Sequence, residues 1–328
     1  QVDGISLSPL TWLSGLRQAL WKRDALVEVC AILALTLFAF SLRGVNLFQF
    51  PLGMHFDEGD SAVQGLKILD GTFGAGPFVT GWYNIPTLYS YAQALSLAIF
   101  GRDEAGVRMM TALAGTFLVP LTWVIGRIGW GRLMGSAAAI LMTVSHLFIN
   151  YSRMAGGFLE PAVFACGLLM LPAIIREGRR SSVLFIVVGI TIGLSVYQYY
   201  SGRLVPIIAA VLMLAMTLRR VIKPQQVGIS LVACLLVAAP LLMFYASRPD
   251  QVLGRTIDTS IFLPANMRGI LERDGTLERD GVELILRQVR RASSLFLGSA
   301  DYSGKYFADK SAPGFDPITS LLFWLGAA

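Results

Sequence analysis

The sequence is poor in charged residues. Asp, Glu, Lys and Arg make up 15% of its 328 residues, whereas soluble domains carry about 25%. Apolar residues account for 55%, and the mean hydropathy is +0.62. Apolar runs of roughly 20 residues, long enough to cross a bilayer, recur along the whole chain. The composition therefore excludes a soluble domain and predicts an all-α polytopic membrane protein.

Cysteine and histidine are also scarce, with three and two copies. Each cysteine falls in a separate apolar run, so buried thiols are expected and neither a disulfide framework nor a metal-ligand spacing exists. We expect no required cofactor and no protein-bound metal site. The net charge of +6 comes from basic residues in short loops, which indicate orientation in the membrane, and no nucleic-acid partner is expected.

The N-terminal part of the sequence is not expected to be a cleavable signal peptide. The first apolar run, from about residue 26, is too long for one, and no small-residue cleavage site follows it. Residues 1–25 are expected to form an amphipathic, cytoplasmic segment that leads into a retained span. Because the sequence has no initial Met and ends within an apolar run, it is expected to be part of a longer protein.

About eight spans are predicted from the apolar runs. They are 26–48, 107–126, 133–150, 160–175, 182–199, 203–218, 227–246 and 317 onward. Residues 85–100 are apolar too, but this run is short, contains Pro86 and is interrupted by polar residues. Its length fits either a span or an interfacial helix.

The basic loops decide between these alternatives. If 85–100 does not cross, the four basic groups before the first span and in the loops near 127–132, 176–180 and 219–223 all share one side. That side is the cytoplasm, where Lys and Arg concentrate. The prediction is a transmembrane core over 26–246 with a first outer loop at 49–106, a long outer loop at 247–316, and the start of another span at 317–328. Helical spacing predicts an external amphipathic helix near 282–297.

Two adjacent acids, Asp57 and Glu58, follow the first span, with His55 just before them. Carboxylates at a membrane surface are costly unless solvated or used. A structural role is the simpler explanation, since either acid could cap a helix that starts near Gly59. A second candidate, Glu160, precedes a proline at the outer start of the fourth span, which also fits a helix cap. Both positions face outward, so a shared catalytic cavity is an alternative that does not exclude capping.

Basic and aromatic residues on the same side form a third group. Tyr199 and Arg203 lie in the tight outer turn between the fifth and sixth spans. They could be ordinary interfacial residues, or they could bind a phosphate, which suits the planar guanidinium. Arg153 and Arg108 present the same choice between snorkelling to head groups and binding substrate.

The order of these motifs resembles the GT-C membrane glycosyltransferases. The similarity is greater to the family of protein O-mannosyltransferases and the aminoarabinose transferase that modifies lipid A, in a bacterial branch. The matching segments, in order, are Phe56-Asp57-Glu58, Asn84-Ile85-Pro86-Thr87-Leu88-Tyr89, Phe100-Gly101-Arg102-Asp103-Glu104-Ala105-Gly106-Val107-Arg108, and Tyr151-Ser152-Arg153 with an acid shortly after it. The resemblance covers most of the chain from about residue 26, although members of the family usually extend past residue 328.

The resemblance implies a GT-C bundle with interfacial helices in the first outer loop, located in the plasma membrane. It implies transfer of a sugar, with inversion, from a polyprenyl-phosphate carrier to a protein, lipid or glycan on the non-cytoplasmic face. Asp57 would be the general base and Glu58 would orient the acceptor or position Asp57. Substrate-binding roles are expected for His55, Arg153, Glu160, Tyr199 and Arg203. A divalent cation, Mg²⁺ or Mn²⁺, is compatible with such a site but not required.

The sequence departs from the family at Asn84, where relatives often carry a lysine that is thought to reach the donor phosphate. This departure supports an alternative, a non-catalytic subunit of a larger membrane complex built on a transferase scaffold. A secondary transporter would need acids near the middle of spans and related half-repeats, neither of which is visible.

Overall fold

The computed structural model describes residues 23–157, 160–176, 181–260, 262–264, 266–268, 281–297 and 315–327. Within these ranges the regular structure is helical, and β pairing is limited to one isolated bridge between Thr80 and Pro86. The predicted all-α class is confirmed. Most of the predicted 1–25 segment and much of the predicted 247–316 loop lie outside the described residues. The helices are α2 (Arg23–Gly44), α3 (Phe56–Leu69), η1 (Trp82–Asn84), α4 (Leu88–Phe100), α5 (Glu104–Trp130), α6 (Arg132–Val144), α7 (His146–Ser152), α8 (Glu160–Arg176), α9 (Ser182–Ser195), η2 (Tyr200–Arg203), α10 (Leu204–Leu218), α11 (Pro224–Ser247), α12 (Asp250–Thr259), α14 (Gly281–Ser294), η3 (Leu295–Leu297) and α15 (Pro317–Ala327).

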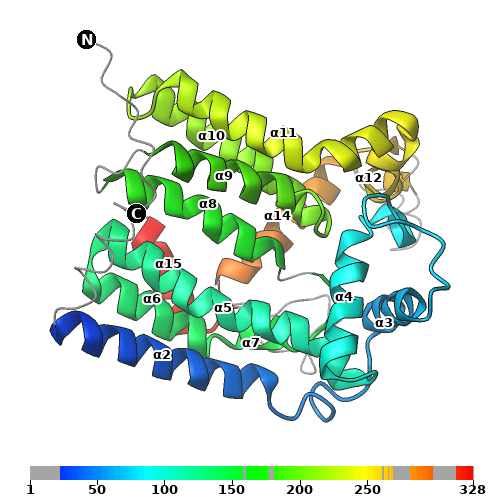
Figure 1. Ribbon diagram of the computed structural model, residues 1–328. Helices are drawn as coiled ribbons and strands as arrows, with labels where there is room; N and C mark the ends of the chain where they lie inside the picture. The colour runs from blue at the N-terminus through cyan, green and yellow to red at the C-terminus, as the bar shows by residue number, and fades with distance from the viewer. Residues whose placement is uncertain are drawn as a thin grey trace.

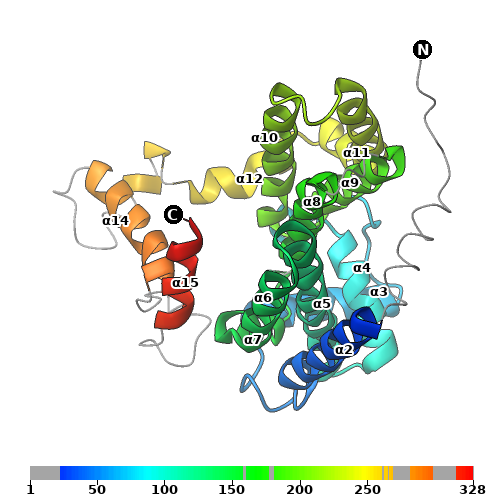
Figure 2. The same cartoon turned by 90° about the vertical axis from the view of Figure 1, so that its left-hand side faces the viewer.

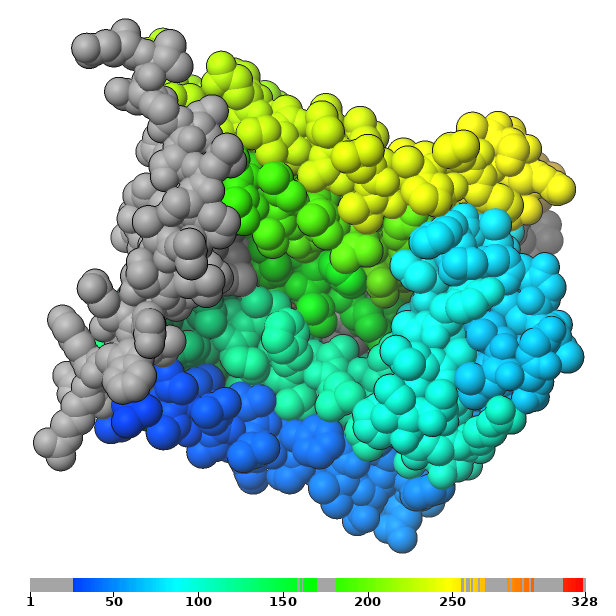
Figure 3. Space-filling model, viewed as in Figure 1, coloured from blue at the N-terminus to red at the C-terminus, as the bar shows by residue number. Residues whose placement is uncertain are grey.

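The long helices form a bundle whose axes run from left to right in Figure 1. The start of α2, the α5–α6 turn and the α10–α11 turn lie at the left-hand end, and they mark three of the four basic groups of the sequence; most of the fourth, near 176–180, lies outside the described residues. Helices α3, α4 and α12 gather at the right-hand end, where their atoms close the bundle in Figure 3. This arrangement supports the prediction that the basic loops share one side.

Within the described part of the chain, four helical stretches are long and apolar enough to cross a bilayer: Leu26–Gly44, Glu104–Trp130, Tyr200–Leu218 and Pro224–Ser247. Helices α6 and α7 would add a fifth if the bent pair counts as one span, and α4, α9 and α15 are shorter apolar helices. The chain is thus a multi-pass membrane protein. The total of about eight spans stays a prediction.

The predicted span at 133–150 is broken at Ser145, where α6 and α7 meet at an angle of 58°. The buried guanidinium of Arg43 reaches this break from α2. It donates to the carbonyl oxygens of Thr143 and Met142 at 3.1 and 2.7 Å. A helix end leaves its last carbonyls without intrahelical partners, and such groups are costly away from water. Arg43 therefore stabilises a break that hydropathy could not reveal.

Helix α4 corresponds to the ambiguous apolar run. It has 13 residues, which gives a length of about 20 Å, too short for a hydrocarbon core of about 30 Å. In Figure 1 it runs across the end of the bundle, transverse to α5. The Ser96 hydroxyl donates to the carbonyl of Gly106 at 2.6 Å, and the Gln93 amide donates to the carbonyl of Val107. These bonds fix α4 to the first turn of α5, and its length and direction support the predicted interfacial position.

Small residues bring helices together within the bundle. A Cβ added to Gly189 of α9 would lie 2.3 Å from the carbonyl oxygen of Ser230 in α11, and one added to Gly193 would lie 2.8 Å from that of Cys234. In lipid, where helices gain no hydrophobic advantage from association, close backbone contact of this kind supplies much of the packing energy.

Helices α14 and α15 stand apart from the bundle in Figure 2. They contact each other through η3, where the indole of Trp324 donates to the carbonyl of Phe296 at 2.9 Å and the Phe296 and Phe323 rings stack. Helix α14 confirms that the residues near 282–297 form a helix.

Candidate active site

The site is built around the first turn of α3, at the right-hand end of the bundle. His55 is the N-cap: its Nδ1 accepts from the Asp57 backbone N–H at 3.2 Å, and its own N–H donates to Glu58 Oε2 at 2.9 Å. This reciprocal pair is a capping box, which satisfies two backbone donors at the start of the helix. The prediction that an acid caps a helix starting near Gly59 is corrected: α3 begins at Phe56, His55 is its N-cap, and Glu58 takes part from the third position of the helix through the capping box.

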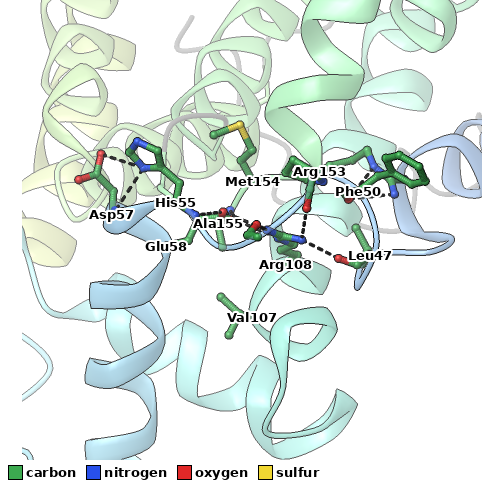
Figure 4. A network of polar contacts seen from close by, with 12 residues as sticks. Leu47, Phe50, His55, Asp57, Glu58, Val107, Arg108, Arg153, Met154 and Ala155 are labelled. Carbon is green, nitrogen blue, oxygen red and sulfur yellow. Dashed lines mark hydrogen bonds and ion pairs between the residues drawn. The ribbon is translucent and has the colours of Figure 1, made fainter. Parts of the chain in front are cut away.

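Glu58 is also half of a buried ion pair, shown in Figure 4. Its partner is Arg108 of α5, whose Nε and Nη2 lie 3.0 and 3.2 Å from the two carboxylate oxygens. The side chains are 1% and 0% exposed. The backbone N–H of Ala155 donates a further hydrogen bond to Oε1 at 2.9 Å. With both oxygens bonded and shielded from solvent, Glu58 is placed to hold the site together and not to touch an acceptor.

The rest of the Arg108 guanidinium organises the loop between α2 and α3. Its Nη atoms donate to the carbonyls of Leu47 and Pro51 at 2.7 and 3.1 Å, and also to that of Gly53. One buried cation thus joins α5, the loop and the start of α3. Of the two roles considered for Arg108, snorkelling and substrate binding, the structure shows neither: the residue is structural.

Asp57, the neighbouring acid, points a different way. Its side chain is 22% exposed, and its Oδ2 lies 3.7 Å from His55 Nδ1. Since Nδ1 accepts the Asp57 N–H, the imidazole proton belongs on Nε2 and this contact is an ion pair only when His55 is protonated. Asp57 therefore keeps a solvent-accessible carboxylate. Glu58, one residue further along the helix, points in a different direction and is buried.

A pocket of about 30 Å³ opens beside Asp57, with room for about two water molecules. It receives residues from α3, η1, α4, the turn before α8 and the start of η2. These are Asp57, Ser61, Gln64, Trp82, Ile85, Tyr89, Ser90, Gly156, Gly157 and Tyr199. The pocket can receive the tip of a substrate, such as a hydroxyl group.

Glu160 lies behind the wall of this pocket. The residue is 7% exposed, and its Oε1 accepts a hydrogen bond from the Thr111 hydroxyl at 2.8 Å. Tyr89, which lines the pocket, is close enough to feel the Glu160 charge: burial raises the pKa of Tyr89, and the carboxylate raises it further. The tyrosine hydroxyl consequently stays protonated and can donate a hydrogen bond. Glu160 thus does not line the pocket itself, and its charge acts there on the Tyr89 hydroxyl.

Arg153 has partners that favour a structural role over the predicted substrate contact. Its guanidinium donates to five carbonyl oxygens in the last turn of α2 and the loop that follows, at 2.8–3.2 Å. A cation is favoured at a helix C-terminus, where carbonyl groups lack partners. Arg153 therefore fixes the direction in which the chain leaves α2.

Tyr199 and Arg203 were expected to face the acids, and Tyr199 does line the Asp57 pocket. Arg203 lies one turn further, where Nη2 donates to the Tyr245 hydroxyl at 3.0 Å and Nη1 donates to the carbonyl of Val252. Its guanidinium carbon also sits 4.6 Å from the centre of the Tyr200 ring. Arg203 thus connects η2 to α11 and α12 beside the pocket, with one donor of each Nη accounted for by these bonds.

Helix α12 packs over the first outer loop and covers the position of Asn84. The Thr80 hydroxyl is bonded to Gln251, and a Cβ added to Gly254 would lie 2.5 Å from Asn84 Nδ2. Asn84 has a φ of +58°, a left-handed conformation that asparagine tolerates better than lysine. The uncharged residue at this position therefore fits both its backbone and its contact with α12.

Tyr89 is one of the pocket residues that sequence reasoning missed. It belongs to a segment interpreted mainly as apolar. A signal was present, because Tyr89, Gln93 and Ser96 recur at i, i+4 and i+7, the spacing of one helix face, and all three are buried.

No cluster of three or more His, Cys, Asp or Glu side chains that could hold a metal occurs among the described residues. Asp57 and Glu160 do not form such a group. The residues in the described part of the site thus offer hydrogen bonds and charge.

Comparison with known proteins agrees with this architecture. Residues 84–244, about half of the chain, match the family described as dolichyl-phosphate-mannose-protein mannosyltransferase. Among solved structures, the chain is similar to ArnT from Cupriavidus metallidurans bound to undecaprenyl phosphate, with a TM-score of 0.53 and 12% sequence identity. The similarity covers 72% of this chain and 44% of that one, so the chain spans less than half the length of the solved relative. Curated protein sequences gave no match.

Proposed function

We propose that the chain is a GT-C membrane glycosyltransferase, which transfers a sugar from a polyprenyl-phosphate donor to an acceptor hydroxyl at the Asp57 pocket. One observation carries the proposal. The structure separates two adjacent acids, leaving Asp57 accessible in a pocket while Glu58 is bonded within the protein. This division provides a base at the surface and a buried group that fixes its position.

In the proposed reaction, the Asp57 carboxylate accepts the proton of the acceptor hydroxyl as its oxygen attacks the anomeric carbon. The new carbon–oxygen bond forms opposite the bond that breaks, so the configuration inverts. The electron pair of the broken bond leaves with the polyprenyl phosphate. A phosphate leaving group needs little protonation, and one base is sufficient.

The surrounding residues would assist in distinct ways. The Glu58–Arg108 pair holds the first turn of α3, and hence Asp57, in position. Tyr89 would donate a hydrogen bond to the substrate, with its orientation supported by Glu160. Tyr199, which also lines the pocket, would contact the substrate, and His55 would hold the first turn of α3 in place as its N-cap.

Arg203 is the cation beside the pocket that would bind the donor phosphate. A guanidinium suits a phosphate because it offers several donors in one plane. The match to a structure described as containing undecaprenyl phosphate supports a lipid donor of this class. The active face would be the non-cytoplasmic one, opposite the basic loops.

The activity is tested by incubating the purified protein with a panel of polyprenyl-phosphate sugars and measuring release of free polyprenyl phosphate. We expect release from at least one donor, dependent on an added acceptor. Binding of donor lipid without release from any of them would favour the alternative, a non-catalytic subunit of a larger complex, which the uncharged Asn84 also supports.

Replacing Arg203 by Gln is expected to weaken donor use by about 10- to 100-fold in kcat/KM, the loss typical of one charge-assisted hydrogen bond. The change should appear mainly in the KM for the donor, and Arg203→Lys should recover part of it. Kinetics over a range of donor concentrations would measure both.

A matched control separates this role from the contact with α11. Tyr245→Phe removes the Arg203–Tyr245 hydrogen bond but keeps the positive charge, so donor KM should change by less than about threefold. Equal losses in the two variants would assign Arg203 a purely structural role.

A further inference from the structure

A second cavity lies at the other end of the bundle, where α2 begins, α5 ends and α6 begins. It has a volume of about 410 Å³, within the range of about 300–1,000 Å³ typical of small-molecule sites. Its lining comes from these three helices: Val27, Glu28, Ala31, Ile32, Leu35, Trp123, Arg132, Ser136 and Ile140. Val27 and Ile140 are both more than half exposed, so the cavity opens on the flank of the bundle.

The walls of this cavity are apolar along most of their length. Val27, Ala31 and Leu35 recur every four residues on one face of α2, and Trp123 and Ile140 face them from α5 and α6. A groove of this kind at the side of a membrane bundle suits a hydrocarbon chain, because a polar ligand would lose its hydration against these walls.

Its polar groups gather near the basic end of the bundle. The Glu28 carboxylate, 14% exposed, pairs with Arg127 Nε at 2.6 Å and with Arg132 Nε at 3.3 Å. Two guanidinium groups thus share one carboxylate, which leaves a net charge of one positive unit. The Arg132 side chain is 57% exposed and stands at the rim, where an anionic group can reach its other nitrogens.

We propose that this cavity binds an anionic phospholipid, with one acyl chain between α2, α5 and α6 and the phosphate at Arg132. An apolar groove and a cation at its rim match the two halves of such a lipid. The position also fits, because the basic turns mark the predicted cytoplasmic surface, whose leaflet carries anionic lipids. This site is at the opposite end from the Asp57 pocket and does not depend on sugar transfer.

The test uses the purified protein in neutral phosphatidylcholine nanodiscs, into which phosphatidylglycerol is titrated. Retained lipid is counted by native mass spectrometry, and the unfolding midpoint is followed in parallel. We expect phosphatidylglycerol to be retained preferentially and to raise the midpoint. Arg132→Gln should weaken the apparent affinity by about fivefold, the contribution of one cation at an anionic surface, and Ala31→Phe should reduce retention by occupying the groove.

Two matched variants serve as controls. Arg219→Gln removes a cation from another basic turn, and Leu33→Phe adds an aromatic ring to α2 at a position outside the cavity lining. Both should retain phosphatidylglycerol as the wild type does.

Three results would overturn the proposal. The first is equal retention by the wild type and Arg132→Gln. The second is an equal rise of the midpoint with inorganic phosphate alone, which would indicate an ion site. The third is a disulfide between cysteines introduced at Ile140 and Leu13 that forms even in excess lipid. It would mean that the N-terminal segment of the chain, and not a lipid, occupies the cavity.

Discussion

Arg108→Gln is expected to lower the free energy of unfolding by about 3–5 kcal/mol, the typical cost of removing one partner of a buried ion pair. The variant leaves the Glu58 carboxylate buried without its cation. It also removes donors from the carbonyls of Leu47 and Pro51 in the loop before α3. Since domains are stable by only about 5–15 kcal/mol, a large fraction of the Arg108→Gln variant should be unfolded or poorly expressed. Thermal unfolding in detergent would measure the effect.

The exposed pair of Arg102 and Asp70 provides a matched control. These groups lie 2.8 Å apart with both side chains more than half exposed, so Arg102→Gln should cost less than about 1 kcal/mol. The double variant Glu58→Gln with Arg108→Gln should recover part of the loss, because no charge is then left unpaired. If Arg108→Gln were no less stable than Arg102→Gln, the structural role assigned to the buried pair would be wrong.

The arrangement of the bundle was accessible from sequence because it follows from hydropathy and charge. Apolar runs predicted the long helices, and the basic loops predicted the separation of the two ends. The short run at 85–100 could be assigned from loop charge alone, and α4 indeed lies across the end of the bundle. These patterns are local, so one sequence is sufficient to interpret them.

The division of labour between Asp57 and Glu58 was not accessible in the same way. Composition and spacing cannot distinguish two adjacent acids. The residue that distinguishes them is Arg108, which lies 50 positions further along the chain. The same limit applies to Arg43 and Arg153, whose hydrogen bonds join positions about 100 residues apart. A cation that binds carbonyl groups leaves no sequence signature, because every residue carries a carbonyl.

Asp57→Asn is expected to reduce sugar transfer by about 10²- to 10⁴-fold, the contribution of a general base. The amide has nearly the shape of the carboxylate but cannot accept the acceptor proton. Loss of the negative charge from the first turn of α3 should lower the free energy of unfolding by no more than about 1 kcal/mol, the value of one charge near a helix terminus. Asp70→Asn, at the other end of the same helix, should leave transfer within about threefold of the wild type.

If Asp57 performs the chemical step, its replacement must slow the transfer of sugar from a donor that is already bound, and single-turnover transfer measures this rate. Wild type and Asp57→Asn would be loaded with saturating polyprenyl-phosphate sugar, and donor binding would be measured on the same samples. We expect the folded variant to bind donor within about twofold of the wild type while its transfer rate falls at least 100-fold. Undiminished transfer in a folded Asp57→Asn variant would contradict this role of Asp57.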